Sequence, residues 1–545
     1  MVTDSVSKPA THLGANLQCI AIVGTGPTGI YTFRYLLQSG QHLSVSLIEK
    51  GAQVGVGMPY SPEMASKCML ANIASIEIPP IVQTYLAWLE SQPVDRLRAY
   101  GLNPDDLNER QFTPRLLLGK YFRDELLSLI EQAKAHGNDV KIYEDTEVTD
   151  VAEHEGKLSL ALADGSQLGP FDRVILATGH DFPDADEATR SYFPSPWSGL
   201  IQADVPAVRV GIMGTSLSSI DAAMAVATQH GRFRHNGTDL TYQTTADGLH
   251  MTLMSWTGVL PEADFYCPLP YQPLHIMTDD AVAQCAKAPQ PLDAVFGLMR
   301  DEMMAADPDY ADQIGLATLT ADSFADAYFA KRVSQDPFRW ARKNLAEVEY
   351  NKAHKITVQW RYALLRMHEK IEAIVSCLDE TDRQRFDDGL KKVFVDNYAA
   401  VPSESISRLL ALRDAGVLSV LALGEDYDLA RKSDRTVISA KGRTYVFDVF
   451  IDARGQKALT SADLPFPTLR DALVRAGHDV PLVGEDFGLL EASGYEGRLV
   501  LAAIPYLMYE RPFVQGITAS AEIGEAIAAG LVYTHAPRRR KQRRI

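Results

Sequence analysis

An apolar run that leads into three spaced glycines is the feature that most constrains this chain. The run covers residues 18–31 (QCIAIVGTGPTGIY) and contains Gly24, Gly26 and Gly29. This order is typical of a strand, a tight turn and a helix. Gly24 permits the turn, Gly26 removes a side chain that would block a pyrophosphate, and Gly29 lets the helix pack against the strand. The run therefore predicts phosphates bound at the amino end of a helix, as in dinucleotide-binding domains.

A second strand and an acid strengthen this interpretation. Residues 42–48 (HLSVSLI) are apolar enough for a buried strand, and Glu49 follows them, 20 residues after Gly29. This is the offset at which a carboxylate receives the ribose hydroxyl groups of a dinucleotide. The complete order of strand, glycines, helix, strand and acid is much more specific than the glycines alone.

The chain repeats this pattern once, in a modified form. Residues 212–219 (IMGTSLSS) align without gaps on residues 22–29 (IVGTGPTG), with Gly214 kept and serines at 216 and 219. A serine hydroxyl can itself donate a hydrogen bond to phosphate. We expect a second phosphate turn here; the alternative is a serine-rich helix N-cap after a buried strand.

The second turn favours NADP over NAD. The next strand, residues 251–256, comes late, with Ser255 standing 41 residues after Gly214, and no acid ends it. The 2′-phosphate of NADP needs a cation instead, for which Arg232 and Arg234 are candidates, although both could be ordinary surface residues.

Composition and charge exclude several classes of protein. The 545 residues are 46% hydrophobic and 23% charged, and no apolar run is long enough for a membrane helix. A net charge of −17 disfavours nucleic-acid binding by the body of the protein. The basic run 538–544 is expected to be a disordered, solvated tail.

The cysteines and the start of the chain indicate a compartment. The chain has five cysteines, which form neither a CxxC pair nor a zinc set. The first 16 residues lack the basic and apolar regions of a secretory signal. We therefore expect a cytoplasmic protein without a disulfide-reductase motif and without a metal site.

Two buried strands with small residues at their ends extend the pattern to a whole architecture. They are FDRVILATGH (171–180) and YVFDVFIDARG (445–455). Paired strands of this kind are the chain crossings in flavoproteins with two dinucleotide-binding domains, which this sequence resembles. The resemblance implies FAD at the first turn and NAD(P)H at the second.

The fold class predicted is α/β, with two Rossmann-like dinucleotide-binding domains and a largely helical insertion. Apolar residues recur at helical spacing through the glycine-poor stretch 322–423. The domain limits expected are the following: 17–204, first part of the FAD domain; 205–265, NAD(P)H domain; 266–439, mostly helical insertion; 440–535, second part of the FAD domain; 536–545, basic tail.

Several segments make the resemblance closer, to a bacterial FAD/NAD(P)-binding family that includes N-hydroxylating flavin monooxygenases. They follow the family's order: GVGMPYS (55–61), CMLAN (68–72), Arg115 with GKYF (119–122), ATGH (177–180), residues 397–410 and IDARG (451–455). Together they cover most of residues 17–530.

This resemblance implies hydroxylation of an amine with FAD, NADPH or alternatively NADH, and O₂, through a C4a-hydroperoxyflavin. The leading specific hypothesis is oxidation of L-aspartate to nitrosuccinate. Two other functions stay open: an NAD(P)H-dependent FAD reductase without oxygen insertion, and a non-catalytic flavin-binding redox sensor. The partners expected are a small amino acid and O₂, with no nucleic acid and no membrane; a homo-oligomer is left open.

The candidate site residues fall into two groups. Contacts to the cofactors are expected from Gly24, Gly26, Pro27, Thr28, Gly29, Glu49, Lys50, Met58, Arg115, Val148, Ala177, Thr178, Gly179, Gly214, Thr215, Ser216, Ser219 and Asp452. Asn72 is expected near the flavin or the substrate, or else as a loop-stabilising amide. Arg361, Arg366 and Arg408 are candidate clamps for the carboxylates of the substrate, because a guanidinium binds a carboxylate through two hydrogen bonds. The alternative for each of them is a solvated charge on a helix. His180 is expected to pack at a domain crossing, with proton relay as the alternative.

Overall fold

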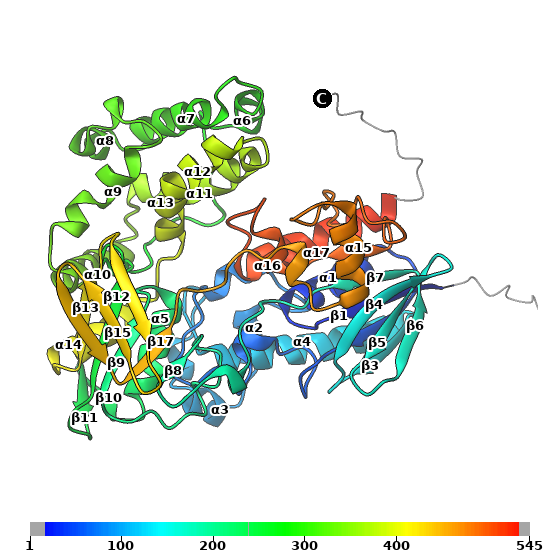
Figure 1. Cartoon of the computed structure of the whole chain (residues 1–545), viewed down its shortest axis with the longest axis horizontal. Coiled ribbons are helices and arrows are strands. Elements are labelled where there is room, and N and C mark those ends of the chain that lie inside the picture. Colours follow the sequence, from blue (N-terminus) through cyan, green and yellow to red (C-terminus); the bar gives the residue numbers. More distant parts are fainter. Residues whose placement is uncertain (1–16, 238, 534–545) are drawn as a thin grey trace, which may run out of the picture.

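The structure is a computed structural model that describes residues 17–237 and 239–533. The expected basic tail at 538–544 lies outside these residues. Two parallel sheets, each covered by helices, stand side by side, and a lobe of helices lies beside the second (Figure 1). The α/β class with a helical insertion is confirmed.

The first sheet has five parallel strands in the order β18-β7-β1-β2-β3. Their bounds are β1 Gln18–Val23, β2 Leu43–Ile48, β3 Asp139–Tyr143, β7 Arg173–Leu176 and β18 Leu499–Leu501. Alternate side chains of β1 enter two different cores, because Ile20 and Ile22 lie in one cluster and Ala21 and Val23 in another. The sheet is therefore buried on both faces, as a parallel sheet requires.

Helices and a small antiparallel sheet surround this first sheet. The helices are α1 Pro27–Gln38, α2 Tyr85–Glu90, α3 Val94–Ala99, α4 Arg115–Ala135, α15 Pro467–Ala476, α16 Ile504–Leu507 and α17 Gly516–Tyr533. The antiparallel strands are β4 Val148–His154, β5 Lys157–Leu162 and β6 Gln167–Phe171. Helices α1 and α17 pack closely, since a Cβ on Gly524 would lie only 2.6 Å from the amide nitrogen of Thr32.

The second sheet also has five parallel strands, in the order β13-β12-β9-β17-β8. Their bounds are β8 Tyr192–Phe193, β9 Arg209–Met213, β12 His250–Ser255, β13 Leu418–Ala422 and β17 Val449–Asp452. Helices α5 Leu217–Ala227 and α14 Ser403–Asp414 belong to this domain, with the hairpin β10 Gly231–Asn236 and β11 Asp239–Thr244 and the antiparallel strands β14 Tyr427–Arg431, β15 Thr436–Ala440 and β16 Arg443–Phe447.

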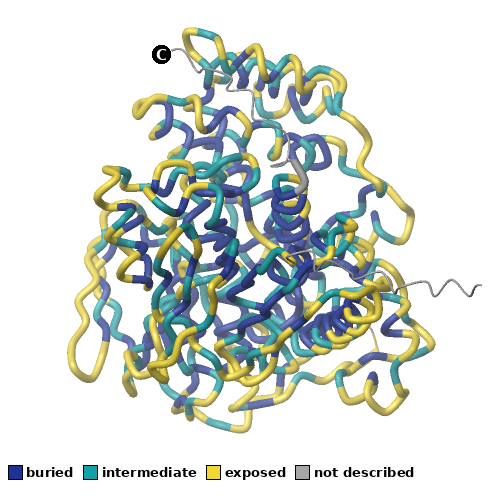
Figure 2. The backbone as a smooth tube through the Cα atoms, turned by 90° about the vertical axis from the view of Figure 1, so that its right-hand side faces the viewer, coloured by how far each residue is buried: buried dark blue, intermediate teal, exposed yellow. Residues whose placement is uncertain are grey.

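The helical lobe has its own core. Its helices are α6 Asp279–Cys285, α7 Pro291–Ala306, α8 Pro308–Ile314, α9 Phe324–Val333, α11 Gln359–Val375, α12 Glu380–Asp388 and α13 Leu390–Tyr398. Helix α10 Pro337–His354 packs on α14 instead, and its buried side chains belong to the core of the second sheet. The apolar face expected on α11 is buried, with Leu364, Met367 and Ile371 fully inaccessible. Buried segments run through all parts of the tube in Figure 2, in agreement with separate cores for the sheets and the lobe.

Strands of the second domain lie outside the limits 205–265 expected for it from the sequence. β8 falls within 17–204 and β17 within 440–535, yet both are in the second sheet. β13, within the expected helical insertion, pairs with β12. A buried strand pairs with partners far away in sequence, and its apolar pattern does not tell which of two sheets receives it. For the same reason, the single strand expected over 445–455 is two strands, β16 and β17, in different sheets.

Among the described residues, no helix combines the length and apolar character needed to cross a membrane, and no group of three or more His, Cys, Asp or Glu side chains could hold a metal ion. All five cysteines are described, and each is a free thiol.

Candidate functional site

In the first phosphate turn, Gly24 and Gly29 stand where the backbone leaves no space for a side chain. Gly24 has a φ of +92°, and a Cβ there would lie 2.3 Å from the carbonyl oxygen of Ala177. A Cβ on Gly29 would lie 2.2 Å from the carbonyl oxygen of Gly24. Both positions therefore exclude any side chain, because backbone cannot yield as a flexible side chain can.

The amino end of α1 supplies the donors for an anion. Gly26 is the N-cap residue, and Pro27 follows it. Because Pro27 has no N–H, the amides of Thr28 and Gly29 are the first donors of the helix. The hydroxyl of Thr28 lies 3.0 Å from that of Ser520 on α17, so it points away from the turn.

A glycine-rich loop closes on this turn. Gly57 approaches Gly26, since a Cβ on Gly26 would lie 3.3 Å from the Cα atom of Gly57. Met58 and Tyr60 bound a short 3-10 helix. The loop also rests on α4, where a Cβ on Gly119 would lie 2.5 Å from the carbonyl oxygen of Tyr60. Gly26 and Gly57 put no side chain at the amino end of α1, which fits the close approach of the pyrophosphate of FAD.

Glu49 lies at the end of β2, as predicted, and is tied to the turn. Its Oε2 atom accepts hydrogen bonds from the amide (3.0 Å) and the hydroxyl (2.7 Å) of Thr25. Its Oε1 atom accepts one from the amide of Gly51 (3.0 Å). The neighbouring candidates lie further out: Lys50 forms an exposed ion pair with Glu147 (3.2 Å), and Val148 is half-buried at the start of β4.

The second turn repeats the first in its backbone. Gly214 has a φ of +132°, and a Cβ there would lie 2.8 Å from the carbonyl oxygen of Ala453. Its amide donates to the carbonyl of Met254 (2.7 Å), just as the amide of Gly24 donates to that of Ile48 (2.8 Å). The strand–turn–helix predicted at 212–219 is therefore present.

The two serines of the second turn differ in what they can bind. Ser216 is the exposed N-cap residue of α5, and its side chain makes no capping hydrogen bond. Ser219 is buried, and its hydroxyl donates to the carbonyl of Ser216 (2.6 Å). Of these two hydroxyl groups, that of Ser216 is the one free to contact a phosphate.

Ser255 occupies the place that Glu49 has in the first domain. The hydroxyl of Thr215 donates to the Oγ atom of Ser255 (3.2 Å), as Thr25 does to Glu49. The second domain thus has a neutral group where the first has a carboxylate. Arg232 and Arg234 are exposed on the hairpin that leaves the carboxyl end of α5 and returns to the amino end of β12, far from the phosphate turn. Their interpretation as phosphate ligands is wrong, because the topology carries them to the opposite edge of the sheet.

The two chain crossings lie side by side. The amide of Ala177 donates to Val23 and that of Ala453 to Met213, each at 2.8 Å, so the crossings meet the two turns in the same way. The amide of Asp181 donates to the Oε1 atom of Gln456 (3.0 Å), which joins the crossings directly.

The remaining candidates at the crossings are placed as follows. Thr178 is exposed, and Gly179 has a φ of +75°. Asp452 is paired with Arg454, whose Nη2 atom lies 2.6 Å from its Oδ2 atom. Burial lowers the pKa of His180, while a hydrogen bond with Gln456 acts in the opposite direction. His180 lies next to Phe182, with ring centroids 5.9 Å apart, as expected for packing at a crossing.

Arg115 connects the two nucleotide domains. Its Nη2 atom lies 2.8 Å from the Oδ2 atom of Asp221 on α5, and both side chains are largely buried. Its guanidinium carbon stands 5.5 Å from the centre of the Trp197 ring. Burial raises the pKa of Asp221 to about 6, and Arg115 opposes that rise.

Three buried polar atoms without a hydrogen-bond partner lie on two adjoining segments. They are Asn72 Oδ1, Ser75 Oγ and Gln111 Oε1. Asn72 and Ser75 lie on a segment that is hydrogen-bonded to the segment carrying Gln111, since the amide of Ser75 donates to the carbonyl of Gln111 (3.2 Å). A buried polar atom without a partner costs about 1–3 kcal/mol. Three on adjoining segments are typical of a place that a ligand completes.

A partly buried cluster of charged side chains lies over the same segment and was missed by sequence reasoning. Tyr271 donates to the Oε1 atom of Glu77 (3.4 Å), and Arg110 donates to the carbonyl of Cys267 (3.0 Å). Burial raises the pKa of Glu77, and the neighbouring Asp264 raises it further. The carboxylates of Glu77 and Asp264 are far apart in sequence, so no spacing pattern could have found them.

The three arginines predicted as substrate clamps all have partners within the protein. Arg361 is buried, with its Nη1 atom 3.3 Å from the Oε2 atom of Glu262. Arg366 donates to the carbonyls of residues 272 (3.0 Å) and 273 (3.1 Å). Arg408 binds Glu404 and the carbonyl of Cys68. Their role toward a substrate stays a prediction.

Two segments near the end of the chain complete the first domain on its far side, within the range 440–535 expected for its second part. β18 ends beside β7, and the amide of Ala502 donates to the carbonyl of Leu176 (2.9 Å). Helix α17 then begins at Gly516 and packs on α1.

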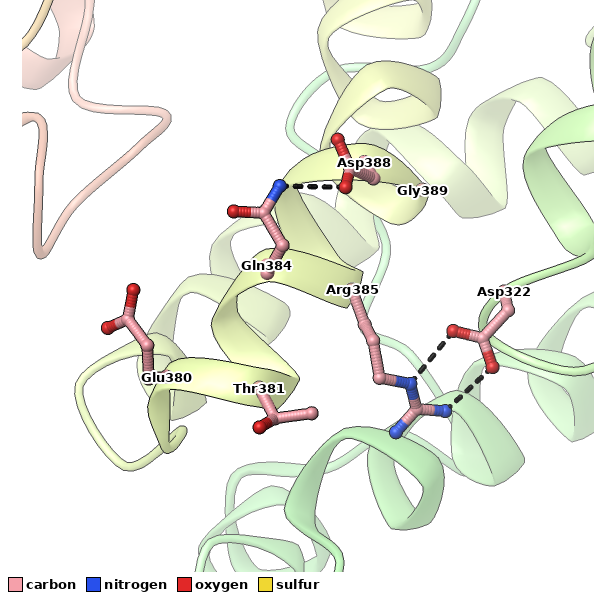
Figure 3. A pocket seen from close by; sticks show the side chains of 7 residues that line it. All are labelled: Asp322, Glu380, Thr381, Gln384, Arg385, Asp388 and Gly389. Carbon is pink, nitrogen blue, oxygen red and sulfur yellow. Dashed lines mark hydrogen bonds and ion pairs between the residues drawn. The ribbon is translucent and has the colours of Figure 1, made fainter.

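Two cavities lie away from both turns. One of about 550 Å³ is inside the helical lobe (Figure 3), where Arg385 binds Asp322 through Nε and Nη2, each at 2.8 Å. Its lining residues are Asp322, Glu380, Thr381, Gln384, Arg385, Asp388 and Gly389. The other, of about 270 Å³, lies between α11 and α17, where burial raises the pKa of Glu372 to about 7. Neither cavity includes a residue of the two phosphate turns.

Comparison with known proteins agrees with the geometry. A family model described as FAD-NAD(P)-binding matches residues 21–181, and one described as YdhS-like middle domain matches residues 278–398. The expectation of FAD and a nicotinamide cofactor is thereby confirmed. The Escherichia coli (strain K12) protein named "Uncharacterized protein YdhS" is 53% identical over 531 residues, which cover 96% of this chain and 99% of that protein.

Solved structures share the fold at low sequence identity. The Kutzneria sp. 744 ornithine N-hydroxylase, solved with reduced FAD, NADP⁺ and L-ornithine, is 12% identical with a TM-score of 0.50, over 95% of this chain and 100% of that one. The reduced ornithine hydroxylase PvdA of Pseudomonas aeruginosa is 13% identical with a TM-score of 0.50, over 96% of this chain and 100% of that one. At these identities the likeness shows the fold alone.

Proposed function

Because this chain belongs to the YdhS-like family and carries an FAD-NAD(P)-binding domain, we propose that it is an FAD-dependent monooxygenase that consumes NADPH and hydroxylates the amine of a small amino acid. The observation that carries the proposal is the pair of phosphate turns built on one backbone plan and joined by adjacent crossings. This arrangement supports two dinucleotides held in one molecule, one on each sheet.

The first turn is assigned to FAD and the second to NADPH. Glu49 stands where ribose hydroxyl groups would be received, and Ser255 stands at the same place in the second domain without a charge. A neutral group leaves room for the 2′-phosphate of NADPH, whereas a carboxylate would repel it.

The chain's own residues have the task of binding, orientation and exclusion of water. Bound FAD would supply the electron transfer and oxygen chemistry. Asn72 Oδ1, Ser75 Oγ and Gln111 Oε1 have no hydrogen-bond partner within the protein, which supports a role for them in hydrogen bonds to a buried ligand. Glu77 follows Asn72 and Ser75 on the same segment, and Tyr271 donates a hydrogen bond to its carboxylate (3.4 Å).

Fold likeness supports amine hydroxylation, since both solved structures are of ornithine hydroxylases. L-aspartate as the substrate rests on the family resemblance of the sequence. The pairing of Arg361, Arg366 and Arg408 inside the protein adds no support for a dicarboxylate.

The proposal is tested by mass spectrometry of reactions under ¹⁸O₂. The purified holoprotein is mixed with NADPH and, in separate reactions, with L-aspartate, L-ornithine and L-glutamate. We expect one amine to stimulate NADPH oxidation and to carry labelled oxygen on its nitrogen. Consumption of NADPH that yields only hydrogen peroxide with every amine would contradict the proposal and favour a reductase.

A further inference from the structure

The residue after Ser255 is a large aromatic side chain on the surface. Trp256 is 42% exposed, and its position corresponds to that of Lys50 in the first domain. An exposed tryptophan next to a ribose-binding position offers a flat apolar face on which an adenine ring can stack.

A lysine from the helical lobe stands over this ring. The Nζ atom of Lys392, on α13, lies 4.8 Å from the centre of the Trp256 ring. Its carboxylate neighbour, Asp388, is 4.0 Å away, at the limit of an ion pair, and the Lys392 side chain is 41% exposed. The ammonium group is therefore held near the aromatic face while it remains open to an anion.

A second lysine lies near the same segment. The amide of Gly424 donates to the carbonyl of Trp256 (3.0 Å). A Cβ on Gly424 would lie 3.2 Å from the Cε atom of Lys441, so this side chain covers the strand end next to Trp256. Lys441 is exposed in the turn between β15 and β16.

The two domains thus differ in charge at equivalent places. Glu49 receives hydrogen bonds at the end of β2, and its neighbour Lys50 is paired with Glu147. At the end of β12 there is a hydroxyl group, an aromatic face and two ammonium groups. In a chain with a net charge of −17, such local cations are what a phosphate monoester requires.

The geometry points to a binding site for the adenosine 2′-phosphate of NADPH, formed by Ser255, Trp256, Lys392 and Lys441. Lys392 and Lys441 bind the phosphate and Trp256 stacks on the adenine. The helical lobe therefore takes part in nucleotide recognition through Lys392. This inference rests on the proposed use of the second turn by NADPH, but not on the reaction that follows.

Isothermal titration calorimetry of the FAD-loaded protein tests the site without turnover. The probes are adenosine 2′,5′-bisphosphate, which carries the 2′-phosphate, and 5′-ADP, which lacks it. We expect Lys392→Ala and Lys441→Ala each to weaken binding of the bisphosphate about tenfold and to leave binding of 5′-ADP unchanged. Trp256→Ala should weaken both probes. Lys391→Ala is the matched control, since Lys391 is the neighbouring residue on α13 and is paired with Asp387 (2.8 Å).

The outcomes separate this inference from the proposed reaction. Unchanged affinity for the bisphosphate in both lysine variants would overturn the site, and so would a wild-type protein that does not bind the bisphosphate. If the lysine variants lose affinity as expected but no amine acquires oxygen, the site stands and the monooxygenase proposal falls.

Discussion

The two phosphate turns share a backbone and differ in their side chains. In each, the glycine after the first strand accepts no Cβ because a crossing carbonyl lies against it, Ala177 in one and Ala453 in the other. In each, the same glycine amide donates to the end of the neighbouring strand. The third position differs: Gly29 lies against the carbonyl of Gly24, whereas Ser219 has room for a side chain.

This difference teaches that only the first glycine is required for the backbone of a phosphate turn to adopt its conformation. The later positions set how closely the helix approaches the strand and what the turn offers to a ligand. The first turn is the tighter of the two, and it carries the acid. The second accepts side chains, and its specificity lies in Ser255 and the residues around it.

The largest effect is expected when the residues at the third position, Gly29 and Ser219, are exchanged between the turns. In Gly29→Ser, the new Cβ would lie 2.2 Å from the carbonyl of Gly24, so α1 must move out of its place between the sheet and α17. We expect the free energy of unfolding to fall by more than about 3 kcal/mol. The reverse change, Ser219→Gly, should cost about 1–2 kcal/mol through helix propensity and one lost hydrogen bond. Urea unfolding followed by circular dichroism compares them, and equal losses would show that the turns do not differ in tightness.

Helices α1 and α5 should differ in how their buried residues make the stability of the protein depend on pH. Asp221 on α5 corresponds to Tyr31 on α1, and burial raises the pKa of Asp221 to about 6. A carboxyl whose pKa is raised on folding stabilises the protein below its ordinary pKa of about 4, and this stability is lost as the pH rises through about 6. Relative to Asp221→Asn, the wild-type free energy of unfolding should therefore fall by up to about 3 kcal/mol between pH 4 and pH 7.

Thermal unfolding at several pH values measures this difference. Tyr31→Phe is the control, because Tyr31 donates to the carbonyl of Pro79 (2.5 Å) and burial raises its pKa well above the range studied. Its cost should not vary with pH in that range. If the free energies of unfolding of the wild type and of Asp221→Asn changed in parallel with pH, the raised pKa of Asp221 would be refuted.

Substitutions at the two N-cap positions, Gly26 and Ser216, should affect the binding of different cofactors. Gly26→Val places a branched side chain between the turn and Gly57, where even a Cβ would stand 3.3 Å from the Cα atom of Gly57. We expect binding of FAD to weaken about a hundredfold, or about 2.7 kcal/mol. Ser216→Val should leave flavin content unchanged and weaken NADPH binding. Flavin absorbance per protein is the measurement, and a yellow Gly26→Val protein with full flavin would remove FAD from the first turn.

The smallest effect is expected when the acid of the first domain, Glu49, is copied to position 255 of the second domain. Ser255→Glu gives the second domain the carboxylate of the first, which repels a 2′-phosphate and can receive ribose hydroxyl groups. The preference for NADPH over NADH in anaerobic flavin reduction should fall roughly tenfold. Ser255→Ala removes the hydroxyl bonded to Thr215 without adding charge and serves as the control. An unchanged preference in Ser255→Glu would separate Ser255 from nucleotide recognition.

Local patterns in the sequence predicted both turns, the fold class and the apolar face of α11, because glycine sterics and helical periodicity act over a few residues. They did not predict that β8 and β17 join the second sheet, since partners of a buried strand are chosen by long-range packing. The cluster of Glu77 with Asp264 and the internal partners of Arg361 and Arg366 depend on how loops from different domains meet. No spacing within one segment records such contacts.

The position of β18 has a consequence for how the protein is made. β7 pairs with β1 on one side and with β18 on the other, so the first sheet has an open edge until residues 499–501 have been synthesised. At usual rates of translation, the interval after β7 lasts roughly 15–65 s. During that time an unpaired strand edge can capture another chain. Synthesis of this protein therefore passes through a long stage at risk of aggregation, which ends only when the last strand and α17 close the domain.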